Sequence, residues 1–396
     1  MNLNSGQHRA LKLMNERTLL LLLCKKRRSL RDLSKETRLS VSGVTTLMKE
    51  LYERNIVSPL ETYQMGLVGR PAAEWEICKT VGCIMAVQIN RIVNVKLITL
   101  SGDCFLDCNF EVTIPVTDSE LKNIALQLKE IIKEKTVECP LLNITISTPG
   151  KVNKTTGIVE YTFFYAGERN TTLRSIFEET FNCKVYVKNV LRFALLSEFY
   201  KHGLQNKLDN ALYLRIGESI GGALFLNGEL YEGANGYSGE FGYFLTDYTP
   251  TAYDNYNLHE KFYYNYGSLE RVRKVIENAI VEKEETVLTL DSLTISNIFE
   301  AYFGGDLLAV KVIDAWFEVN CKVLRSIIEV LDLNNIILEF REAQITEKII
   351  KKFETSLNKD SRGTVVSVNS AGEQSAEYGL KVYAIEQAVE DLMNKL

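Results

Sequence analysis

The sequence is poor in proline, and its composition shows no sign of intrinsic disorder. Only 6 of its 396 residues are proline, while 46% are hydrophobic and 24% are charged. This balance is typical of an ordered globular protein with enough apolar side chains to form a core. The length predicts two or three domains.

Segments for membrane insertion and secretion are also missing. The most apolar stretch, residues 19–24, is far shorter than the roughly 18 residues that a membrane-spanning helix needs, and Lys and Arg residues follow it directly. No secretory leader is recognisable. The eight cysteines are scattered without regular spacing, which favours reduced thiols. We therefore expect a cytoplasmic protein that contacts no membrane.

A net positive charge is found only in the first part of the chain. The first 80 residues hold 14 Lys and Arg against 8 Asp and Glu, a net charge of +6. The remaining residues hold 32 against 43, a net charge of −11. A basic N-terminal part on an acidic protein is what a nucleic-acid-binding head on a non-binding body would have, because only the head must lie against phosphates.

Three helices are predicted between residues 11 and 54. The first contains the apolar run at residues 19–23 and ends at the basic cluster of residues 25–28, since basic side chains suit a helix C-terminus. Residues 29–32, Ser-Leu-Arg-Asp, have the pattern of a capping box. A second helix of about two turns should therefore follow, through Thr37.

The third helix is predicted to start after Ser40, which can cap it. Its inward stripe consists of Val44, Leu47, Met48 and Leu51, at the spacing i, i+3, i+4, i+7. A helix-turn-helix presents its second helix to base edges, where hydroxyl side chains can approach closely and a lysine can reach phosphate. The candidate DNA-contacting residues here are Ser40, Ser42, Thr45, Thr46 and Lys49.

A β-hairpin is predicted over residues 56–77, with a loop that contains Gly66, Gly69 and Arg70. The natural interpretation is the wing of a winged helix-turn-helix, with Arg70 near the DNA backbone or minor groove. The alternative is that this head is a helical protein-interaction domain, because three short amphipathic helices are common.

From Val81 onwards the pattern changes to strands that then alternate with helices. The predicted strands are 81–90, 92–100, 104–113, 141–147 and 184–188, and the predicted helices are 119–135 and 173–181. The first three strands should pair antiparallel. A second α/β part begins with helix 191–202 and strand 211–215. The order βββαβαβ is that of one lobe of the actin-like, ribonuclease-H-like fold, so two lobes are expected.

The most specific motifs lie between residues 210 and 244. They are residues 210–217 (Asn-Ala-Leu-Tyr-Leu-Arg-Ile-Gly), 220–223 (Ile-Gly-Gly-Ala), 227–234 (Asn-Gly-Glu-Leu-Tyr-Glu-Gly-Ala) and 236–242 (Gly-Tyr-Ser-Gly-Glu-Phe-Gly). In order and spacing they resemble the ROK family, which is named after repressors, open reading frames and sugar kinases. The resemblance covers nearly the whole chain.

The resemblance also implies the domain order. Regulators of the family place a winged helix-turn-helix before the kinase-like part and join the two through Gly-Arg-Pro, which resembles residues 69–71 here. We therefore expect a DNA-binding domain over residues 1–78. A first α/β lobe should span 79–189 together with a C-terminal helix at 376–396, and a second lobe should span 190–375.

The positions that the resemblance assigns to kinase chemistry are altered. The family's Asp-x-Gly-Gly-Thr phosphate loop corresponds to residues 88–92, Gln-Ile-Asn-Arg-Ile, which lack the glycines for close backbone approach. In the second loop Gly217, Gly221 and Gly222 match, but residues 218–219 are Glu-Ser instead of Thr-Gly. The catalytic Asp corresponds to Val190, which cannot accept a proton. We expect no catalytic residue, no kinase activity and no cofactor.

The family's structural zinc site is not expected either. Its His corresponds to Tyr243, and no cysteine follows that residue before Cys321. His202 and His259 have no cysteines at ligand spacing, and Cys104 and Cys108 lie on a predicted strand, so structural packing is the better interpretation.

Three residues that the family uses to hold sugar hydroxyls are kept: Asn189, Glu240 and Glu270. Two carboxylates and an amide suit a carbohydrate or a derivative better than an apolar ligand. Alternatively, Asn189 caps the following helix, the glutamates are structural or solvated, and the site has ceased to bind anything.

The sequence thus predicts a regulator, in the family's pattern a repressor of carbohydrate genes, that binds double-stranded operator DNA as a homodimer or higher oligomer and responds to a sugar-type effector. Two other functions stay open. The chain could be an active carbohydrate kinase with an accessory head, or a DNA-binding or scaffolding protein that needs no ligand.

Overall fold

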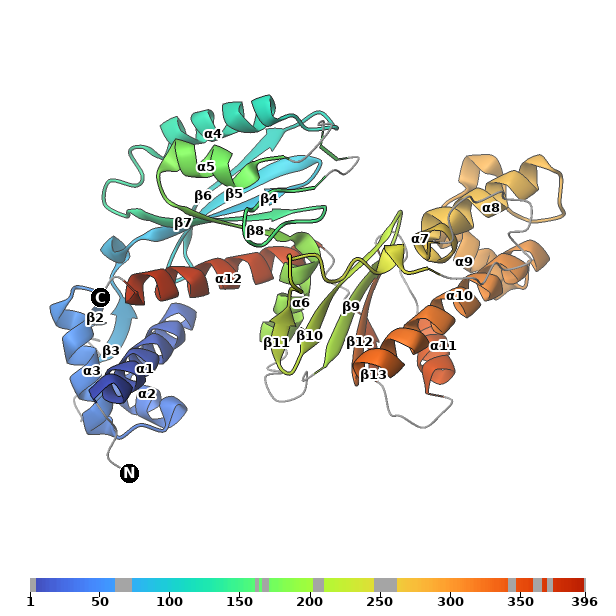
Figure 1. The fold of residues 1–396 in the computed structure, drawn as a ribbon. Coiled ribbons are helices and arrows are strands. Elements are labelled where there is room, and N and C mark those ends of the chain that lie inside the picture. The colour runs from blue at the N-terminus through green and yellow to red at the C-terminus, as the bar shows by residue number, and fades with distance from the viewer. Residues whose placement is uncertain are drawn as a thin grey trace, which may run out of the picture. The chain divides into compact units, whose positions relative to one another are not determined.

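The computed structural model describes residues 5–60, 73–160, 164–165, 171–201, 210–245, 262–340, 347–358, 365–368 and 373–394. The chain divides into two compact units (Figure 1). The first consists of Met1–Asn189 and Leu380–Leu396, and the second of Val190–Gly379.

The first unit begins with a small head of three helices and a three-stranded sheet. The elements are α1 (Ser5–Lys25), β1 (Arg28–Ser29), α2 (Leu30–Thr37), α3 (Val41–Glu53), β2 (Val57–Leu60) and β3 (Glu74–Ile77). The strand order is β1-β3-β2, with both pairings antiparallel. Buried leucines of α1 and the buried Val44, Met48 and Leu51 of α3 form its core. Three helices followed by a hairpin are the winged helix-turn-helix arrangement that the sequence predicts.

Capping side chains set where α2 and α3 begin. The Ser29 hydroxyl accepts from the Asp32 backbone N–H at 3.2 Å, and the Asp32 carboxylate accepts from the Ser29 backbone N–H at 3.3 Å, so the capping box is present. Ser40 caps α3 by accepting from the Gly43 N–H at 3.1 Å. Arg38 adopts the left-handed conformation, with φ of 59°, and ends α2. These local signals produce the tight turn between the two helices.

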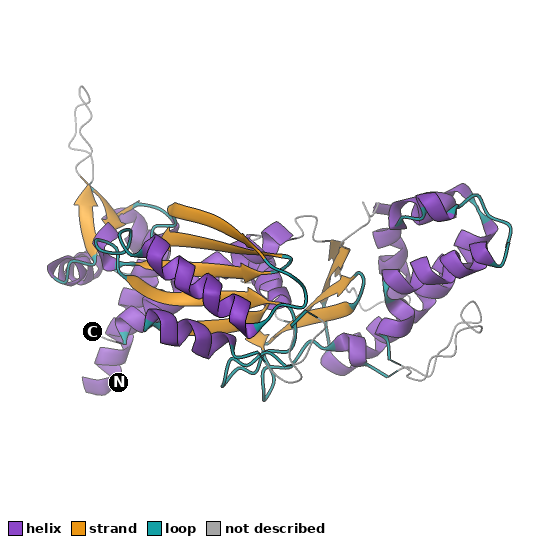
Figure 2. Cartoon of the chain, turned by 90° about the horizontal axis from the view of Figure 1, so that it is seen from above, coloured by secondary structure: helices purple, strands orange, loops and turns teal. Residues whose placement is uncertain are grey.

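The rest of the first unit is a five-stranded sheet with the order β6-β5-β4-β7-β8. Its strands are β4 (Cys83–Ile89), β5 (Ile92–Thr99), β6 (Cys104–Glu111), β7 (Leu141–Thr148) and β8 (Lys184–Asn189). β4, β5 and β6 pair antiparallel, while β7 and β8 join in parallel. Helices α4 (Asp118–Ile132) and α5 (Leu173–Phe181) cover one face (Figures 1 and 2).

The C-terminal helix α12 (Glu373–Met393) belongs to both units, which divide between Gly379 and Leu380. In the first unit it packs on the sheet face opposite α4 and α5 (Figure 1). The buried Asn143 side chain donates to the Ala384 carbonyl at 3.2 Å, and Asp391 accepts from Lys184 at 2.6 Å. Its last turns also reach the head, because Arg17 of α1 pairs with Glu390 at 2.8 Å.

The second unit repeats the same sheet order, β11-β10-β9-β12-β13. Its strands are β9 (Ala211–Ile216), β10 (Ile220–Leu226), β11 (Glu229–Tyr231), β12 (Asn335–Phe340) and β13 (Val365–Val368). Its α-helices are α6 (Val190–Lys201), α7 (Tyr264–Gly267), α8 (Leu269–Val281), α9 (Ile295–Gly304), α10 (Leu307–Leu331) and α11 (Glu347–Leu357). Two sheets, each with an antiparallel trio followed by two parallel strands, confirm the two-lobed actin-like fold.

A buried polar network fixes α7 and the start of α8 to α10 in this unit. The indole of Trp316 donates to the Gly267 carbonyl at 2.7 Å, and the Asn320 amide donates to the same oxygen at 3.3 Å. The Tyr263 hydroxyl bonds to Asn320, and all three side chains are fully buried. Because the polar side-chain atoms of these three residues all have hydrogen-bond partners, the network holds the segment around residue 267 in one position.

All eight cysteines are free. Burial raises the pKa of the Cys24 and Cys183 thiols to about 12, so both stay protonated at neutral pH. Within the described ranges, no helix is both long and apolar enough to cross a bilayer.

Candidate nucleic-acid interface and effector-binding residues

The outer face of α3 carries the predicted base-contacting residues. Ser42, Thr45, Thr46 and Lys49 are all exposed, whereas Val44, Met48 and Leu51 are completely buried. The predicted inward and outward faces of this helix are therefore correct, except that Leu47 of the inward stripe is only half-buried. Ser40 is exposed as well, but its hydroxyl caps the helix.

The hydroxyl groups of this face are already engaged within the helix. Thr45 donates to the Val41 carbonyl at 2.7 Å, and Thr46 donates to the Ser42 carbonyl at 3.1 Å. The Ser42 hydroxyl lies 3.1 Å from that of Ser40. Lys49 is 3.8 Å from Glu53 in an exposed pair, which leaves its ammonium group free to move to another anion.

A second set of basic residues, which our sequence analysis missed, lies on α2. Arg31, Lys35 and Arg38 are exposed, and none forms an ion pair with a residue that the structure describes. Arg31 and Lys35, four residues apart, share one face of the helix, and Arg38 follows them at the C-cap, in the turn before α3. We call these three residues the α2 basic stripe. Its spacing is visible in the sequence and could have revealed it.

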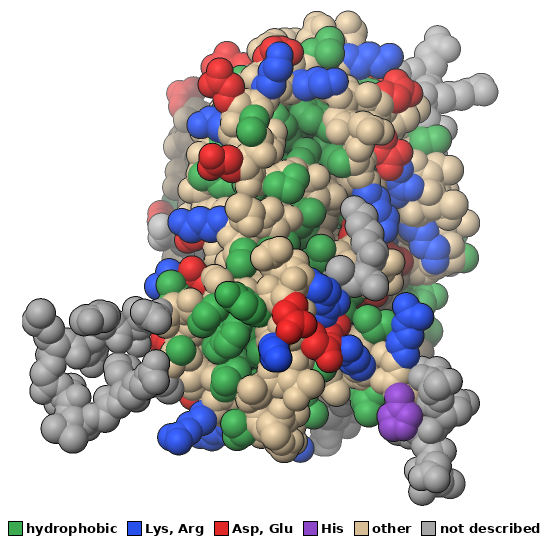
Figure 3. Space-filling model, turned by 90° about the vertical axis from the view of Figure 1, so that its left-hand side faces the viewer, with side chains coloured by type: hydrophobic (Ala, Val, Ile, Leu, Met, Phe, Trp, Pro, Cys, Tyr) green, Lys and Arg blue, Asp and Glu red, His purple; other side chains and the backbone are tan. Residues whose placement is uncertain are grey.

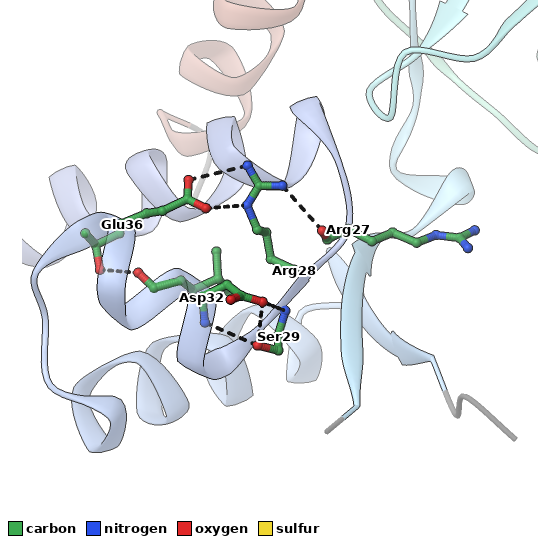
Figure 4. Close-up of polar contacts among 7 residues, drawn as sticks. Arg27, Arg28, Ser29, Asp32 and Glu36 are labelled. Atoms are coloured by element: carbon green, nitrogen blue, oxygen red, sulfur yellow. Dashed lines mark hydrogen bonds and ion pairs between the residues drawn. The ribbon is translucent and has the colours of Figure 1, made fainter. Parts of the chain in front are cut away.

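The cluster at residues 25–28, by contrast, contributes half of its charge to internal ion pairs. Arg28 is buried and its guanidinium contacts both Glu36 carboxylate oxygens, at 2.7 and 3.4 Å (Figure 4). Arg27 pairs with Glu76 of β3 at 2.8 Å. Arg28 therefore fixes β1 to α2 and is not free for phosphates, whereas Arg27, whose side chain is 60% exposed, pairs with Glu76 at the surface.

Further basic residues of the head serve the same structural purpose. Glu16 of α1 is 1% exposed and accepts from Arg54 at 2.6 Å, and Lys12 pairs with Glu50 of α3. On the face drawn in Figure 3, Lys and Arg side chains alternate with Asp and Glu instead of forming one continuous basic patch. The predicted contact residue Arg70 lies outside the described residues.

The three effector candidates are divided between the two units. Asn189 ends β8 in the first unit, and its side-chain amide donates to the Gly150 carbonyl at 2.8 Å. Glu240 precedes the short 3-10 helix η3 (Phe241–Tyr243), and Glu270 lies in the first turn of α8, both in the second unit. Within that unit the backbone N–H of Glu270 donates to the Gly217 carbonyl at 3.4 Å.

Glu270 is strongly bound by neighbouring cations. Arg273 donates two hydrogen bonds to its carboxylate, at 2.8 and 2.9 Å, and Lys274 lies 3.5 Å away. The hydrogen bonds from Arg273 lower the pKa of Glu270, which is therefore ionised at neutral pH. A ligand hydroxyl could donate to its remaining lone pairs.

The glycines of the family motif have a packing role in this chain. A Cβ on Gly222 would lie 2.5 Å from the Tyr213 carbonyl oxygen, and one on Gly242 would lie 2.5 Å from that of Ile220. At Gly239, where φ is +95°, a Cβ would clash with the Gly222 carbonyl oxygen, and the Gly239 carbonyl accepts from the Gly222 N–H at 2.8 Å. These close backbone contacts require glycine whether or not a phosphate binds.

The positions of the two phosphate loops are occupied by tight turns. β4 and β5 are joined by Asn90 and Arg91 alone, with the Asn90 N–H donating to the Ile92 carbonyl at 3.3 Å. At the β9–β10 turn, Gly217 donates to the Ser219 carbonyl at 3.0 Å, and Glu218 is exposed. Val190 is the first residue of α6.

No group of three or more His, Cys, Asp or Glu that could hold a metal ion occurs in the described part of the chain. The residues that the family's zinc would need do not fit either, since Tyr243 occupies the histidine position.

These features together define the class of protein. A family model described as the ROK family matches residues 92–386, and the chain belongs to this family. In fold, it is similar to a solved ROK family transcriptional regulator described as a homolog of the Escherichia coli Mlc protein. The TM-score is 0.74 at 20% identity, and the match covers 97% of this chain and 99% of that one.

Curated relatives include both repressors and kinases. The xylose repressor of Caldicellulosiruptor bescii is 25% identical over 306 residues, which cover 76% of each protein. The beta-glucoside kinase of Listeria monocytogenes is 27% identical over 228 residues, covering 56% of this chain and 71% of the kinase.

Proposed function

We propose that this protein is a DNA-binding transcriptional repressor of carbohydrate-utilisation genes, in which a kinase-like body that has lost its activity senses a sugar or sugar derivative. The observation that supports this most strongly is the head. The head contains a helix with an exposed hydroxyl-bearing face, and before it the α2 basic stripe, which forms no ion pair with a described residue. This head precedes a ROK body whose relatives include repressors.

In this proposal, α3 lies in the major groove and α2 crosses the phosphate backbone, as in other helix-turn-helix proteins. Ser40, Ser42, Thr45 and Thr46 lie at the bases, and Lys49 reaches a phosphate. Arg31, Lys35 and Arg38 add three phosphate contacts beside the turn. Arg70 would contact the backbone or minor groove from the hairpin loop. A homodimer or higher oligomer would place two heads about 34 Å apart on successive turns of the duplex.

Loss of kinase activity follows from three substitutions that act at different steps. Val190 replaces the general base, which alone typically contributes about 10² to 10⁴ in rate. The Asn90-Arg91 turn places side chains where a glycine loop would approach phosphates, and the exposed Glu218 carboxylate would repel them. The retained Gly222 does not argue for ATP binding, because its close approach to the Tyr213 carbonyl already requires glycine.

The effector would be bound through Asn189, Glu240 and Glu270, whose amide and carboxylate groups suit several hydroxyls. It must bind one state of the protein better than the other to change DNA binding. Helix α12 offers a physical link for this change. Ser375 near its start donates to the buried Glu198 of α6 at 3.0 Å, and Glu390 near its end pairs with Arg17 of the head.

The test for DNA binding uses the full chain and a randomised duplex pool. We expect retention that falls as salt rises, because bound phosphates release counterions. The triple variant Arg31→Gln, Lys35→Gln, Arg38→Gln should reduce the slope of log affinity against log salt by about 3, at roughly 0.9 per phosphate contact.

The matched control removes the same charge from the first lobe, at the exposed Lys122, Lys129 and Lys135. That control should keep the slope of the unmodified protein. Equal slopes for the two triple variants would contradict the assignment of α2 to the phosphate backbone.

The competing functions are tested by two further assays. ATP-dependent phosphorylation of any sugar in a panel, abolished by Asn189→Ala, would establish an active kinase and refute this proposal. Thermal-shift screening of the same panel tests the effector site. A responding sugar should lose its effect in Glu240→Gln but keep it in Glu277→Gln, which removes a carboxylate that also pairs with Arg273. No response to any sugar would favour a DNA-binding protein that needs no ligand.

A further inference from the structure

The exposed face of α3 contains a single side chain of the types that form paired hydrogen bonds with a purine. Its exposed residues are Val41, Ser42, Thr45, Thr46, Lys49, Tyr52 and Glu53. Guanine is usually read by Arg or Lys, and adenine by Asn or Gln, through two parallel hydrogen bonds. Lys49 is the only exposed residue of the helix that belongs to this group, and it lies at the third turn. The exposed face of α3 therefore offers few groups that could read a purine through hydrogen bonds.

The threonine hydroxyls are also committed. Thr45 and Thr46 direct their protons to carbonyl oxygens four residues earlier, at 2.7 and 3.1 Å, so these protons are not available to a base. What remains outward is one methyl group from each threonine, together with the 49% exposed side chain of Val41. Apart from the Ser42 hydroxyl, the face that a base edge would meet is consequently methyl-bearing over the first turns of the helix.

A methyl-bearing face has a specific counterpart in the major groove. Thymine carries a C5 methyl group there, and apolar contact with threonine methyl groups is a recognised way of reading it. We propose that Thr45 and Thr46 read thymine through methyl–methyl contact, so that thymine at defined positions determines which duplex this head prefers. This inference rests on the proposed function, because it specifies what the same interface recognises.

The experiment compares thymine with uracil, which differs only by the methyl group. The full chain is first used to enrich sites from a randomised thymine-containing duplex pool. In the enriched duplex, each thymine is then replaced by uracil in turn. At the contacted positions, affinity should fall about fourfold for each methyl group removed, since burying one such group contributes about that factor. Uracil in the flanking sequence should have no effect.

Two double variants separate the methyl group from the hydroxyl. Thr45→Ser with Thr46→Ser keeps both hydroxyls and removes both methyl groups, so it should bind thymine and uracil duplexes equally. Thr45→Val with Thr46→Val keeps the methyl groups and should retain the full discrimination. Ser, Thr and Val have similar helix propensity, and circular dichroism of both variants checks that α3 still forms.

The outcomes distinguish this inference from the function on which it rests. Equal affinity of the unmodified protein for thymine and uracil duplexes would overturn the inference alone. Discrimination that survives in the serine variant and disappears in the valine variant would also overturn it, because the hydroxyls would then be the readers. Failure to retain any duplex would overturn the proposed function, and the inference with it.

Discussion

The ion pair between Arg28 and Glu36 allows a quantitative test of how the head is held together. The Arg28 side chain is 9% exposed, and Glu36, at 39%, supplies both of its carboxylate oxygens (Figure 4). The guanidinium also donates to the Arg27 carbonyl at 3.4 Å. Replacing Glu36 by Gln would leave a buried cation with neutral acceptors only, the Gln side-chain oxygen and the Arg27 carbonyl.

The expected cost lies between that of a buried and an exposed pair. Removing one partner of a fully buried pair costs about 3 to 5 kcal/mol, whereas exposed pairs contribute about 0 to 1 kcal/mol. Because Glu36 is partly solvated, we expect Glu36→Gln to destabilise the packing of α2 on β1 by about 1 to 3 kcal/mol. The local opening constant should then rise about 5- to 150-fold, since 1.4 kcal/mol corresponds to a factor of ten.

Hydrogen exchange of peptides from residues 28–39 measures this opening, with peptides from α10 as the internal reference. The matched control is Glu53→Gln, which makes the same chemical change in the same head but affects only the exposed Lys49 pair at 3.8 Å. The control should change protection by less than about 0.5 kcal/mol. Equal protection in the two variants would refute the view that the buried pair holds α2 in place.

Three further predictions concern other parts of the molecule. Hydrogen bonds from Ser29 lower the pKa of Asp32 below its ordinary 3.8, so this cap stabilises the head above pH 3.8 and is lost as pH falls further. The acid unfolding of α2 can be monitored by hydrogen exchange, and the Asp32→Asn variant should lose that pH dependence. Gly239→Ala, whose new Cβ would meet a backbone carbonyl, should lower the melting temperature more than Gly228→Ala, where φ is also positive but the space is open. Arg17→Gln should reduce the effect of an effector on DNA affinity while changing the free energy of unfolding by less than about 1 kcal/mol.

Much of the head could be predicted because its signals are local. The capping residues Ser29 and Ser40 fixed the starts of two helices, and the spacing of the apolar residues in α3 determined its buried face. In the body, α5 occupies residues 173–181, the range predicted from the sequence. Helix α1 was predicted less well. It begins at Ser5, before the apolar residues that indicated it, because polar residues continue the helix without a periodic pattern.

The errors and omissions involve contacts between distant residues. Strand β1 is two residues long and forms only because β3 pairs with it, so no local sequence pattern predicts it. Whether Arg27 and Arg28 are free for phosphate likewise depends on Glu76 and Glu36 in the folded head. The glycines at 221 and 222 suggested half of a phosphate loop, whereas the structure gives them packing contacts that a sequence does not reveal.

For the effector residues, the sequence and the structure give complementary information. The motif positions indicate Asn189, Glu240 and Glu270, but not their present partners. In the structure Asn189 bonds to Gly150, and Glu270 is bound by two cations. An effector must therefore compete with, or add to, contacts that already stabilise these groups.

The most direct test of the account is the salt dependence of duplex binding by the full chain, measured by fluorescence anisotropy on an enriched site. With six or more phosphate contacts, affinity should fall by about 10³ or more between 50 and 200 mM salt. Binding that is absent at low salt, or an affinity that does not change over this range, would contradict the claim that residues 1–78 bind the DNA backbone.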